Sequence, residues 1–555
     1  MKTAGDTRLL LSVGLLLASL GVRAQNDVVF RAMHDEMQRS MQKLQLENLE
    51  KPYFISYRVI DNESTQINAA LGSLIYRSQT RARILTVSVR VGDYALDSSN
   101  FVGGGMQFAA GLAALPLDDN YDELRRQIWL ATDTAYKKAL EDLSGKRAAL
   151  QNVTRTDDTP DFSNVTPVSI TEMAPHLPLD LNSASQYARA GSALFRKAPW
   201  IQTSRVQLSV SSVLQRYLNS EGSTFTRATP RVSLRVLAST QASDGSPLSD
   251  FITCYGYSMR DLPSESVLSS QIVDLQRRLK NLQAAPSQSR YNGPVLFEGQ
   301  AAAEVFAHHF AALLPVEPAG TSNTQAQPSL PAGLLGRLNA RVLPEFLSVV
   351  DDPTVTHQGG DILFGAYKVD EEAVPSRPTT VVEHGILKAL LTSRAPVQGI
   401  ATSSANMRER GVAPSNLFVK SDKALPSAEL TRRLVESSRT RGNDYGIVIR
   451  RLSGDSVTLA YRVYADGHEE LVRNAKVEGL DERSFKDITD VSDQGFVYTD
   501  TAPLRRGPVF TTGVGVQPLV SYVVPSLLFD DATVVKASEK TPKLPIASNP
   551  LMEAQ

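Results

Sequence analysis

The sequence contains very little cysteine and histidine, and this limits the chemistry it can support. Cys254 is the only cysteine among 555 residues, so neither an internal disulfide nor a Cys-x-x-Cys metal site can form. It lies in the segment FITCYGY, where we expect a buried, small apolar residue rather than a nucleophile. None of the seven histidines lies four residues from another, which is the spacing that lets two histidines on one helix bind zinc.

Charge bias and several well-known motifs are also absent. The net charge is −1 at pH 7 and no basic block occurs, so electrostatics give no indication of nucleic-acid binding. The serine-hydrolase motif G-x-S-x-G and the phosphate-binding P-loop do not occur. Beyond the N-terminus, no stretch is apolar enough to predict a membrane span.

The N-terminus has the pattern of a signal peptide. Lys2 and Arg8 precede an apolar run over residues 9–22, and small residues occupy the −3 and −1 positions before a cut after Ala24. No cysteine follows the cut, so a lipid anchor is not expected. We predict a signal peptide over residues 1–24 and export to the periplasm or the extracellular space.

The spacing of apolar residues predicts both helices and strands. Apolar positions three and four residues apart predict helices over 27–48, 124–143 and 268–282. Alternating apolar residues predict strands, and the clearest are at 53–59, 84–91, 206–210, 232–236, 445–450, 456–464 and 470–473. A hairpin is expected over 379–391, with its turn at Gly385, and residues 151–185 are expected to be a surface connection.

These elements predict an α+β fold in two main parts, because a chain of this length exceeds a single compact core. We predict an α+β N-terminal part over residues 25–290, with a second run of strands at about 200–262. A β-rich C-terminal domain is predicted over residues 291–540, followed by a tail over 541–555.

We take residues 293–315 as the segment around which the chain is organised. We predict a short strand over 295–297, a glycine turn and an Ala-rich helix over 301–314 that ends before Pro315. The helix carries two adjacent histidines, His308 and His309.

Two adjacent histidines do not make a helical zinc site, because neighbouring helical residues point about 100° apart. Glu304 lies four residues before His308 and can share its face, but one glutamate and one histidine are half a site. We therefore favour an interpretation in which one histidine packs inside the protein and the other faces a cleft or water.

The other histidines and the acidic clusters are expected to be solvated. His34 lies on a predicted helix, and the others lie in loops or turns: His176, His357, His384 and His468. The acidic pairs and triplets at 351–352 and 370–372 are read as solvated loops, with a cation site as the alternative.

Several segments, in order, resemble the TldD/PmbA family of metallopeptidase-related proteins. The segment GAYKVDEEAVP at 365–375 resembles the family's acidic segment ending in Gly-Val-Pro, and VEHGILK at 382–388 is similar to its Glu-Asn-Gly-Val-Leu-Lys hairpin. Further similar segments are NSEG at 219–222, YRVYADG at 461–467 with LVR at 471–473, and TGVGVQP at 512–518. The resemblance covers nearly the whole mature chain and is strongest after residue 290.

The resemblance implies an α+β N-terminal part, a β-rich C-terminal part and a cleft that accepts extended peptides. It also implies a dimer, often a heterodimer of one catalytic and one non-catalytic subunit. Catalytic members carry the zinc motif H-E-x-x-x-H and a late cysteine ligand. Here Ala307 stands at the first histidine, His308 at the glutamate and Ala312 at the second histidine, and the late cysteine has no counterpart.

The resemblance therefore points to the motif-less subunit. It would bind peptide or unfolded protein and pair with a TldD-like paralogue, or with itself, while zinc would belong to the partner. One alternative is a self-sufficient metallopeptidase that uses His308 or His309 with Glu304 and a ligand such as His384 or Asp370. Another is a peptide-binding scaffold without an enzymatic partner.

Overall fold

The computed structural model describes residues 27–102, 111–151, 158–173, 179–322, 333–409, 411–502 and 517–537, together with residue 550. The predicted signal peptide (1–24) and nearly all of the predicted tail (541–555) lie outside the described residues.

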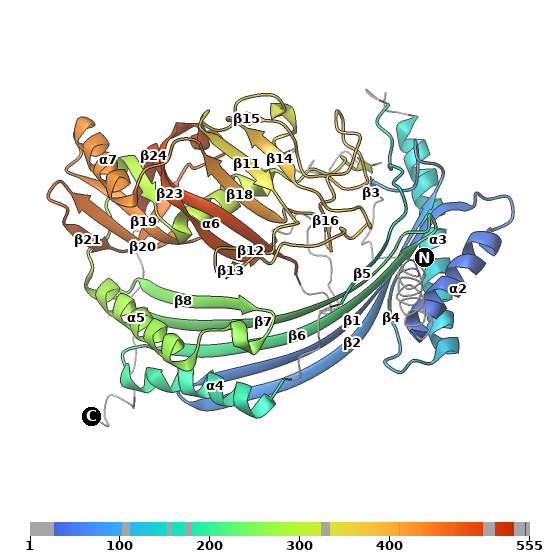
Figure 1. Cartoon of the computed structure of the whole chain (residues 1–555), viewed down its shortest axis with the longest axis horizontal. Coiled ribbons are helices and arrows are strands. Elements are labelled where there is room, and N and C mark those ends of the chain that lie inside the picture. The colour runs from blue at the N-terminus through green and yellow to red at the C-terminus, as the bar shows by residue number, and fades with distance from the viewer. Residues whose placement is uncertain are drawn as a thin grey trace, which may run out of the picture.

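The first half of the chain builds a seven-stranded, strongly curved sheet (Figure 1). Its order is β4-β2-β1-β6-β7-β5, and β8 also pairs with β7. The strands are Pro52–Ala70 (β1), Ser73–Val91 (β2), Leu112–Ala114 (β4), Ser169–Glu172 (β5), Thr203–Asn219 (β6), Thr224–Gln241 (β7) and Pro247–Gly256 (β8). Between β1 and β2, Leu71 and Gly72 both have positive φ, which matches a two-residue hairpin turn.

Helices cover one face of this sheet as two pairs at opposite ends (Figure 1). They are Val28–Lys43 (α2), Tyr121–Leu150 (α3), Leu181–Ala193 (α4) and Glu265–Ala284 (α5). Tyr57 and Val59 of β1 lie in the apolar cluster with α2 and α3, and Ile67 lies in the cluster with α4 and α5. Because these positions differ by even numbers, they point to the same face of the strand. The opposite face of the sheet is turned toward the C-terminal half.

The C-terminal half builds an eleven-stranded sheet with the order β15-β14-β11-β18-β24-β22-β20-β19-β9, in which β21 pairs with β20 and β23 with β24. An additional pairing of β24 with β9 joins five of these strands into a ring. The strands are Tyr291–Phe297 (β9), Leu347–Asp351 (β11), Thr379–Glu383 (β14), Ile386–Leu387 (β15), Asn416–Ser421 (β18), Tyr445–Ser453 (β19), Ser456–Tyr464 (β20), Glu469–Val472 (β21), Ala475–Glu478 (β22), Ile488–Thr501 (β23) and Leu519–Lys536 (β24).

Two helices lie on opposite sides of β9. Gln300–His309 (α6) packs in the large apolar cluster that contains Val295 and Phe297, whereas Ser427–Thr440 (α7) packs against Leu296. Because successive side chains of a strand point to opposite faces, β9 contributes apolar residues to both cores. Short strand pairs complete the fold: Phe101–Val102 (β3) with Thr321–Ser322 (β10), His357–Gln358 (β12) with Asp361–Ile362 (β13), and Met407–Arg408 (β16) with Gly411–Val412 (β17). Short 3-10 helices are Leu194–Lys197 (η1), Met259–Asp261 (η2), Ala311–Leu313 (η3), Leu335–Arg337 (η4) and Ser484–Asp487 (η5).

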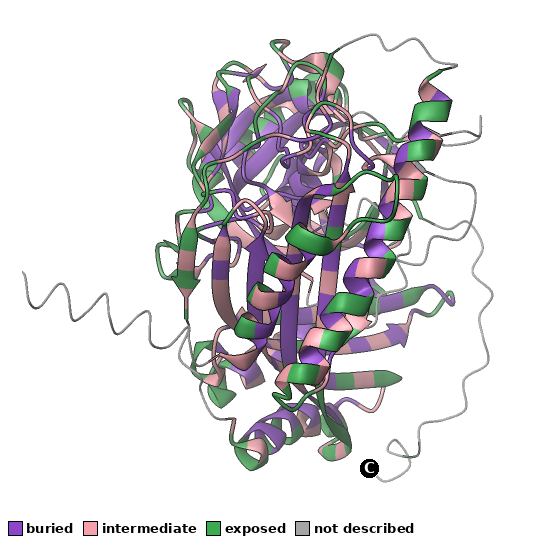
Figure 2. Ribbon diagram, turned by 90° about the vertical axis from the view of Figure 1, so that its right-hand side faces the viewer, coloured by how far each residue is buried: buried purple, intermediate pink, exposed green. Residues whose placement is uncertain are grey.

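The architecture confirms the predicted α+β fold with a strand-rich C-terminal part. Buried residues concentrate in the strands and in the helix faces turned toward them (Figure 2). Within the described residues, no helix is long and apolar enough to cross a bilayer.

Two predictions about connections were wrong. Residues 151–185 are not only a surface connection, because β5 adds to the edge of β7 and α4 begins at Leu181. Asp180 caps that helix by accepting hydrogen bonds from the backbone of Asn182 and Ser183. The hairpin at 379–391 is also shorter than predicted, because Leu391 leaves it to pair with the backbone around Pro315.

Candidate functional site

Helix α6 is positioned by the strand that precedes it. Strand β9 lies between β19 and β24, and the chain then turns at Gly299, whose φ of 57° suits glycine. The buried face of α6 is mostly alanine, which lets the helix approach the sheet closely. The last turns of α6 thus come to lie beside β23 and β24.

The helix ends earlier than the sequence predicted. It stops at His309, and a separate 3-10 turn, η3, follows over Ala311–Leu313. Phe310, between them, is fully buried and stacks on Phe306 at a centroid distance of 5.2 Å. Burial of this ring redirects the chain, so Ala312 does not lie on the same helix as Ala307.

A cleft of about 290 Å³ opens beside the end of α6. It is lined by residues of α6, of the end of β23 and of the approach to β24: Ala307, His308, Asp500, Thr501, Ala502, Gln517 and Tyr522. His308 is exposed at this cleft. Two of the three motif-equivalent positions, Ala307 and His308, therefore line one cavity, and we take it as the candidate functional site.

Acidic and phenolic groups form one wall of the cleft. The hydroxyl of Tyr498 donates to Oδ2 of Asp500 at 3.1 Å, and the backbone N–H of Thr501 donates to Oδ1 at 2.7 Å. Burial and the Asp500 carboxylate raise the pKa of Tyr498, and the same two causes raise the pKa of Tyr522. Both phenols are therefore held as neutral hydrogen-bonding groups at neutral pH.

Sequence reasoning missed Tyr498, Asp500 and Gln517. A usable signal was present, because Tyr498 and Asp500 are two apart on a strand and so share a face. Nothing in the sequence, however, indicated that this face of β23 meets α6.

Glu304 lies inside the protein rather than in the cleft. Its carboxylate accepts hydrogen bonds from Nε2 of Gln300 at 2.8 Å and from the backbone N–H of Leu452 at 2.7 Å. Burial raises the pKa of Glu304 to about 7, although these hydrogen bonds oppose the shift. Within the described part of the chain, Glu304 makes no hydrogen bond to His308, so the two do not act as a pair.

The adjacent histidines point to different surroundings. Nε2 of His309 lies 3.4 Å from Oδ1 of Asp455, and its side chain is 20% exposed. Burial lowers the pKa of His309, and the Asp455 carboxylate opposes this effect. One histidine thus faces protein and the other the cleft, as neighbouring helical positions require.

The residues near α6 do not fit a zinc ion. No group of three or more His, Cys, Asp or Glu side chains in the described parts of the chain could hold a metal. The segment 503–516, beside the cleft in sequence but outside the described residues, contains none of these residue types. The remaining candidates lie apart, since His384 is exposed beside Asp422 and Asp370 is buried in another loop.

The expectation of solvated acidic loops was wrong for both clusters. Asp351 is buried and accepts hydrogen bonds from Nδ2 of Asn406 at 2.7 Å and from the backbone N–H of Ser415 at 2.8 Å. Asp370 is also buried and accepts three backbone N–H groups, from Glu372, Val374 and Met407. These carboxylates hold loops together, and residue types alone could not show that.

The third acid of this region, Glu371, joins the two halves of the molecule. Arg58 of β1, Gln215 of β6 and Arg227 of β7 all donate to its carboxylate. Burial opposes ionisation of Glu371, but Arg227 and Arg58 outweigh it, so its pKa is lowered. Glu371 therefore links the curved sheet to the loop that carries the acidic residues 370–372, and we call this set of contacts the clamp.

The other predicted residues are peripheral. His34, His357, His384 and His468 are exposed, as expected, and His176 lies outside the described residues. Cys254 is half-buried against the α4–α5 cluster, and burial raises the pKa of its thiol, which disfavours a nucleophile.

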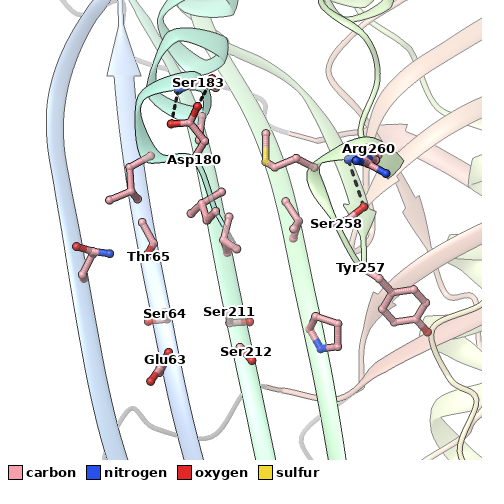
Figure 3. Close-up of a pocket in the computed structure, with 18 of the residues that line it drawn as sticks. Glu63, Ser64, Thr65, Asp180, Ser183, Ser211, Ser212, Tyr257, Ser258 and Arg260 are labelled. Carbon is pink, nitrogen blue, oxygen red and sulfur yellow. Dashed lines mark hydrogen bonds between the residues drawn. The ribbon is translucent and has the colours of Figure 1, made fainter. Parts of the chain in front are cut away.

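A second, larger hollow of about 1150 Å³ lies on the helix-covered face of the first sheet, beside α4 and the segment 257–260 (Figure 3). Its polar lining is largely paired internally. Asp180 caps α4, Ser64 bonds to Thr80, and Ser258 accepts from the backbone of Arg260. None of the positions that the family resemblance singles out lines this hollow.

Residues 289–536 match the family model described as the PmbA/TldA metallopeptidase C-terminal domain. Residues 289–536 therefore belong to the TldD/PmbA family. The chain is 35% identical over 79 residues to a protein named metalloprotease from Archaeoglobus fulgidus, which is 14% of this chain and 17% of that relative. It is 24% identical over 150 residues to the metalloprotease TldD homolog of Buchnera aphidicola, which is 25% of this chain and 28% of the relative.

The fold is also that of solved TldD/PmbA structures. TldE from Thermococcus kodakarensis superposes with a TM-score of 0.56 at 12% identity, covering 91% of this chain and all of that chain. A structure described as a putative modulator of a DNA gyrase from Thermotoga maritima gives a TM-score of 0.57 at 14% identity, covering 87% and 96%. At these identities, the similarity to the solved structures concerns the fold alone. The sequence alignments to the two curated relatives named above each span less than a third of the relative's length.

Proposed function

We propose that this chain is an exported, non-catalytic, peptide-binding subunit that acts in proteolysis beside a paralogue carrying H-E-x-x-x-H. The observation that carries the proposal is the cleft at the end of α6. There, the positions equivalent to the first histidine and the glutamate of the family motif are Ala307 and His308, and the third, Ala312, lies beyond the helix end. The cleft retains acidic and phenolic hydrogen-bonding groups but lacks a zinc ligand set.

The face of the first sheet opposite the helices supports peptide binding. Strands β6 and β7 place Val206, Leu208, Val232 and Leu234 in the helix-side core. Alternate residues on the other face are Gln207, Ser209, Arg231 and Ser233, which are hydrogen-bonding side chains turned toward the C-terminal half. Such a surface can hold an extended peptide through polar contacts and through its backbone. Export is proposed from the N-terminal signal pattern.

One observation favours the alternative of a self-sufficient enzyme. Glu304 has a pKa raised to about 7, the range suited to a general base. Its carboxylate is however engaged by Gln300 and Leu452, and His309 is engaged by Asp455. We therefore place the non-catalytic subunit first.

A reconstitution experiment tests the proposal. The mature chain, its H-E-x-x-x-H paralogue and their mixture would be assayed for binding and hydrolysis of fluorescein-labelled random octapeptides. We expect the chain alone to bind peptides without hydrolysing them, and the mixture to co-elute in gel filtration and to hydrolyse faster than the paralogue alone. Absence of peptide binding by the chain and by the mixture would overturn the proposal.

Zinc content separates the two functions. Elemental analysis would compare the wild-type chain with the variant His308→Ala/His309→Ala and with the control His357→Ala/His468→Ala, which removes two exposed histidines elsewhere. We expect no stoichiometric zinc in any of them. About one zinc per chain, lost only from the first variant and accompanied by chelator-sensitive hydrolysis, would instead establish the self-sufficient enzyme.

A further inference from the structure

Arg231 lies on the polar face of β7. Its Nη1 donates to the backbone oxygen of Gln517 at 2.7 Å, and Gln517 lines the α6 cleft. Val232 and Leu234 of the same strand are buried in the helix-side core, so Arg231 points toward the C-terminal half. This arginine thus connects the curved sheet to the edge of the candidate site.

Arg231 is half-buried without an ion pair, unlike five other buried or half-buried arginines of the described residues. Arg83, Arg90, Arg216, Arg227 and Arg394 each lie within ion-pairing distance of an aspartate or glutamate. Across the described residues, Arg231 has no such ion pair, and its guanidinium donates to a neutral carbonyl, that of Gln517. Burial, together with the positive charge of Arg408, lowers the pKa of Arg231 to about 10, whereas Tyr255 and Glu409 oppose the shift.

Arg408 adds a second guanidinium in the same region. It lies over the ring of Tyr367 at 4.5 Å and reaches the backbone oxygen of Gly365 at 3.5 Å, and among the described residues it also has no ion pair. Two cations close enough to influence one another, neither of them in an ion pair among the described residues, are unfavourable in a protein interior, although Glu409 acts favourably on Arg231 and Arg408 acts on Asp351 and Glu371. An arrangement of this kind is stabilised when a ligand supplies the negative charge.

The walls around Arg231 suit a peptide. Tyr255 of β8 and Tyr257 both contact Phe364, with ring centroids 6.0 and 5.1 Å apart, where β8 passes beneath the C-terminal half (Figure 1). Burial raises the pKa of Tyr255, the Asp500 carboxylate adds to this effect, and Arg231 opposes it, so Tyr255 interacts electrostatically with both Asp500 and Arg231. Aromatic walls beside a guanidinium provide apolar contact next to a carboxylate binder.

We propose that Arg231, supported by Arg408, forms a subsite that binds a carboxylate of the peptide held beside the α6 cleft. The planar guanidinium fork matches a carboxylate and binds it through two hydrogen bonds. Both the C-terminal carboxylate of a peptide and an acidic side chain have this chemistry. The inference rests on the peptide-binding function proposed above and adds the chemical group that the site selects.

The test compares three pools of random octapeptides, each with an N-terminal fluorescein, in an anisotropy assay with the full mature chain. The first has free C-termini and no acidic residues, the second is amidated and has no acidic residues, and the third is amidated with one internal Asp or Glu. We expect the free-carboxylate or the acidic pool to bind at least ten times more tightly than the neutral amidated pool. Which of the two does so identifies the source of the carboxylate.

Variants assign the preference to Arg231. Arg231→Gln should remove the preference for a carboxylate, and Arg231→Lys should keep only part of it, because an ammonium cannot bind a carboxylate bidentately. Arg235→Gln is the matched control, because it removes the same charge from an exposed arginine on the same face of β7. Thermal melting of each variant verifies folding.

The outcomes separate the inference from the proposed function. If the wild-type chain binds all three pools equally, or if Arg231→Gln keeps the preference, the carboxylate subsite is wrong while peptide binding stands. If no pool binds, both the proposed peptide-binding function and the carboxylate subsite are wrong. A preference that Arg235→Gln abolishes equally would indicate general positive charge rather than a site and would also overturn the inference.

Discussion

Glu304 is a buried acid whose ionisation opposes folding. Its folded-state pKa of about 7 lies above the ordinary value of 4.5, so the folded state holds the proton more tightly than the unfolded chain. The stabilisation is fully present below pH 4.5 and is lost as the pH rises toward 7. Glu304→Gln removes this dependence, and the Gln300 amide can rotate to accept from the new one.

We therefore expect the free energy of unfolding of Glu304→Gln, relative to wild type, to rise by about 2 kcal/mol between pH 5 and pH 8. Urea denaturation at the two pH values measures this change. A difference between variant and wild type that does not depend on pH would contradict the raised pKa.

Asp351 and Asp352 are neighbours with opposite surroundings. Asp351→Ala leaves the buried donors of Asn406 and Ser415 unpaired, and we expect a loss of about 3 kcal/mol in the free energy of unfolding. The carboxylate of Asp352 accepts from the backbone and the hydroxyl of Thr354 in an exposed turn, so Asp352→Ala is the matched control, with an expected loss of at most about 1 kcal/mol. Equal losses in the two variants would show that the sequence-based expectation of two solvated acids was correct.

At the scale of elements, the loop that begins at Gly365 is closely packed. A Cβ at this position would collide with the backbone carbonyl of Ser415 and would lie 2.5 Å from Oδ1 of Asn416. We expect Gly365→Ala to lower the free energy of unfolding by about 3 kcal/mol, because backbone atoms cannot move aside. Gly360→Ala, five residues earlier and facing open space, should change it by less than about 0.5 kcal/mol in chemical denaturation. Comparable effects would mean that the loop can relax.

Elements with a clear period were predictable from the sequence. Met33 and Met37 lie on the buried face of α2, Leu85 and Val87 on the buried face of β2, and Asn120 caps α3. The sequence did not predict short elements or the effect of tertiary packing on where an element ends. A four-residue strand such as β5 shows no period, and α6 ended early because Phe310 packs into the core.

The helix of the candidate site could be predicted from the sequence, but the residues around that helix could not. Residues of α6 were identified from the pattern at 293–315, and the cleft does involve Ala307 and His308. Its other wall comes from β23 and from Gln517, about 200 residues later, and no local pattern reports such a juxtaposition. Arg231 was likewise one basic residue in a strand until the fold placed it beside Gln517.

At the scale of the whole molecule, the family-like segments meet where the two halves join. Glu221, in the segment at 219–222, receives two hydrogen bonds of 2.7 Å from the fully buried guanidinium of Arg394. Glu372, in the segment at 365–375, accepts from the backbone N–H of the same arginine. These two segments therefore carry part of the contact between the two halves.

Glu371 is the residue on which this contact can be tested. Glu371→Ala removes the acceptor shared by Arg58, Gln215 and Arg227 and leaves two half-buried cations facing each other, so we expect a loss of about 3–5 kcal/mol. Because the pKa of Glu371 is lowered in the folded state, its contribution to the free energy of unfolding is present above the ordinary glutamate pKa. This contribution is lost as the pH falls through the folded-state pKa.

Denaturation followed by calorimetry measures this loss and shows whether the halves unfold together. Glu478→Ala is the control, because its ion pair with Arg290 is exposed on both sides and should contribute less than about 1 kcal/mol. We expect Glu371→Ala to separate one transition into two, since the C-terminal half keeps its own apolar core when the clamp is removed. A single transition with a loss no larger than that of Glu478→Ala would show that apolar packing, rather than this clamp, couples the two halves.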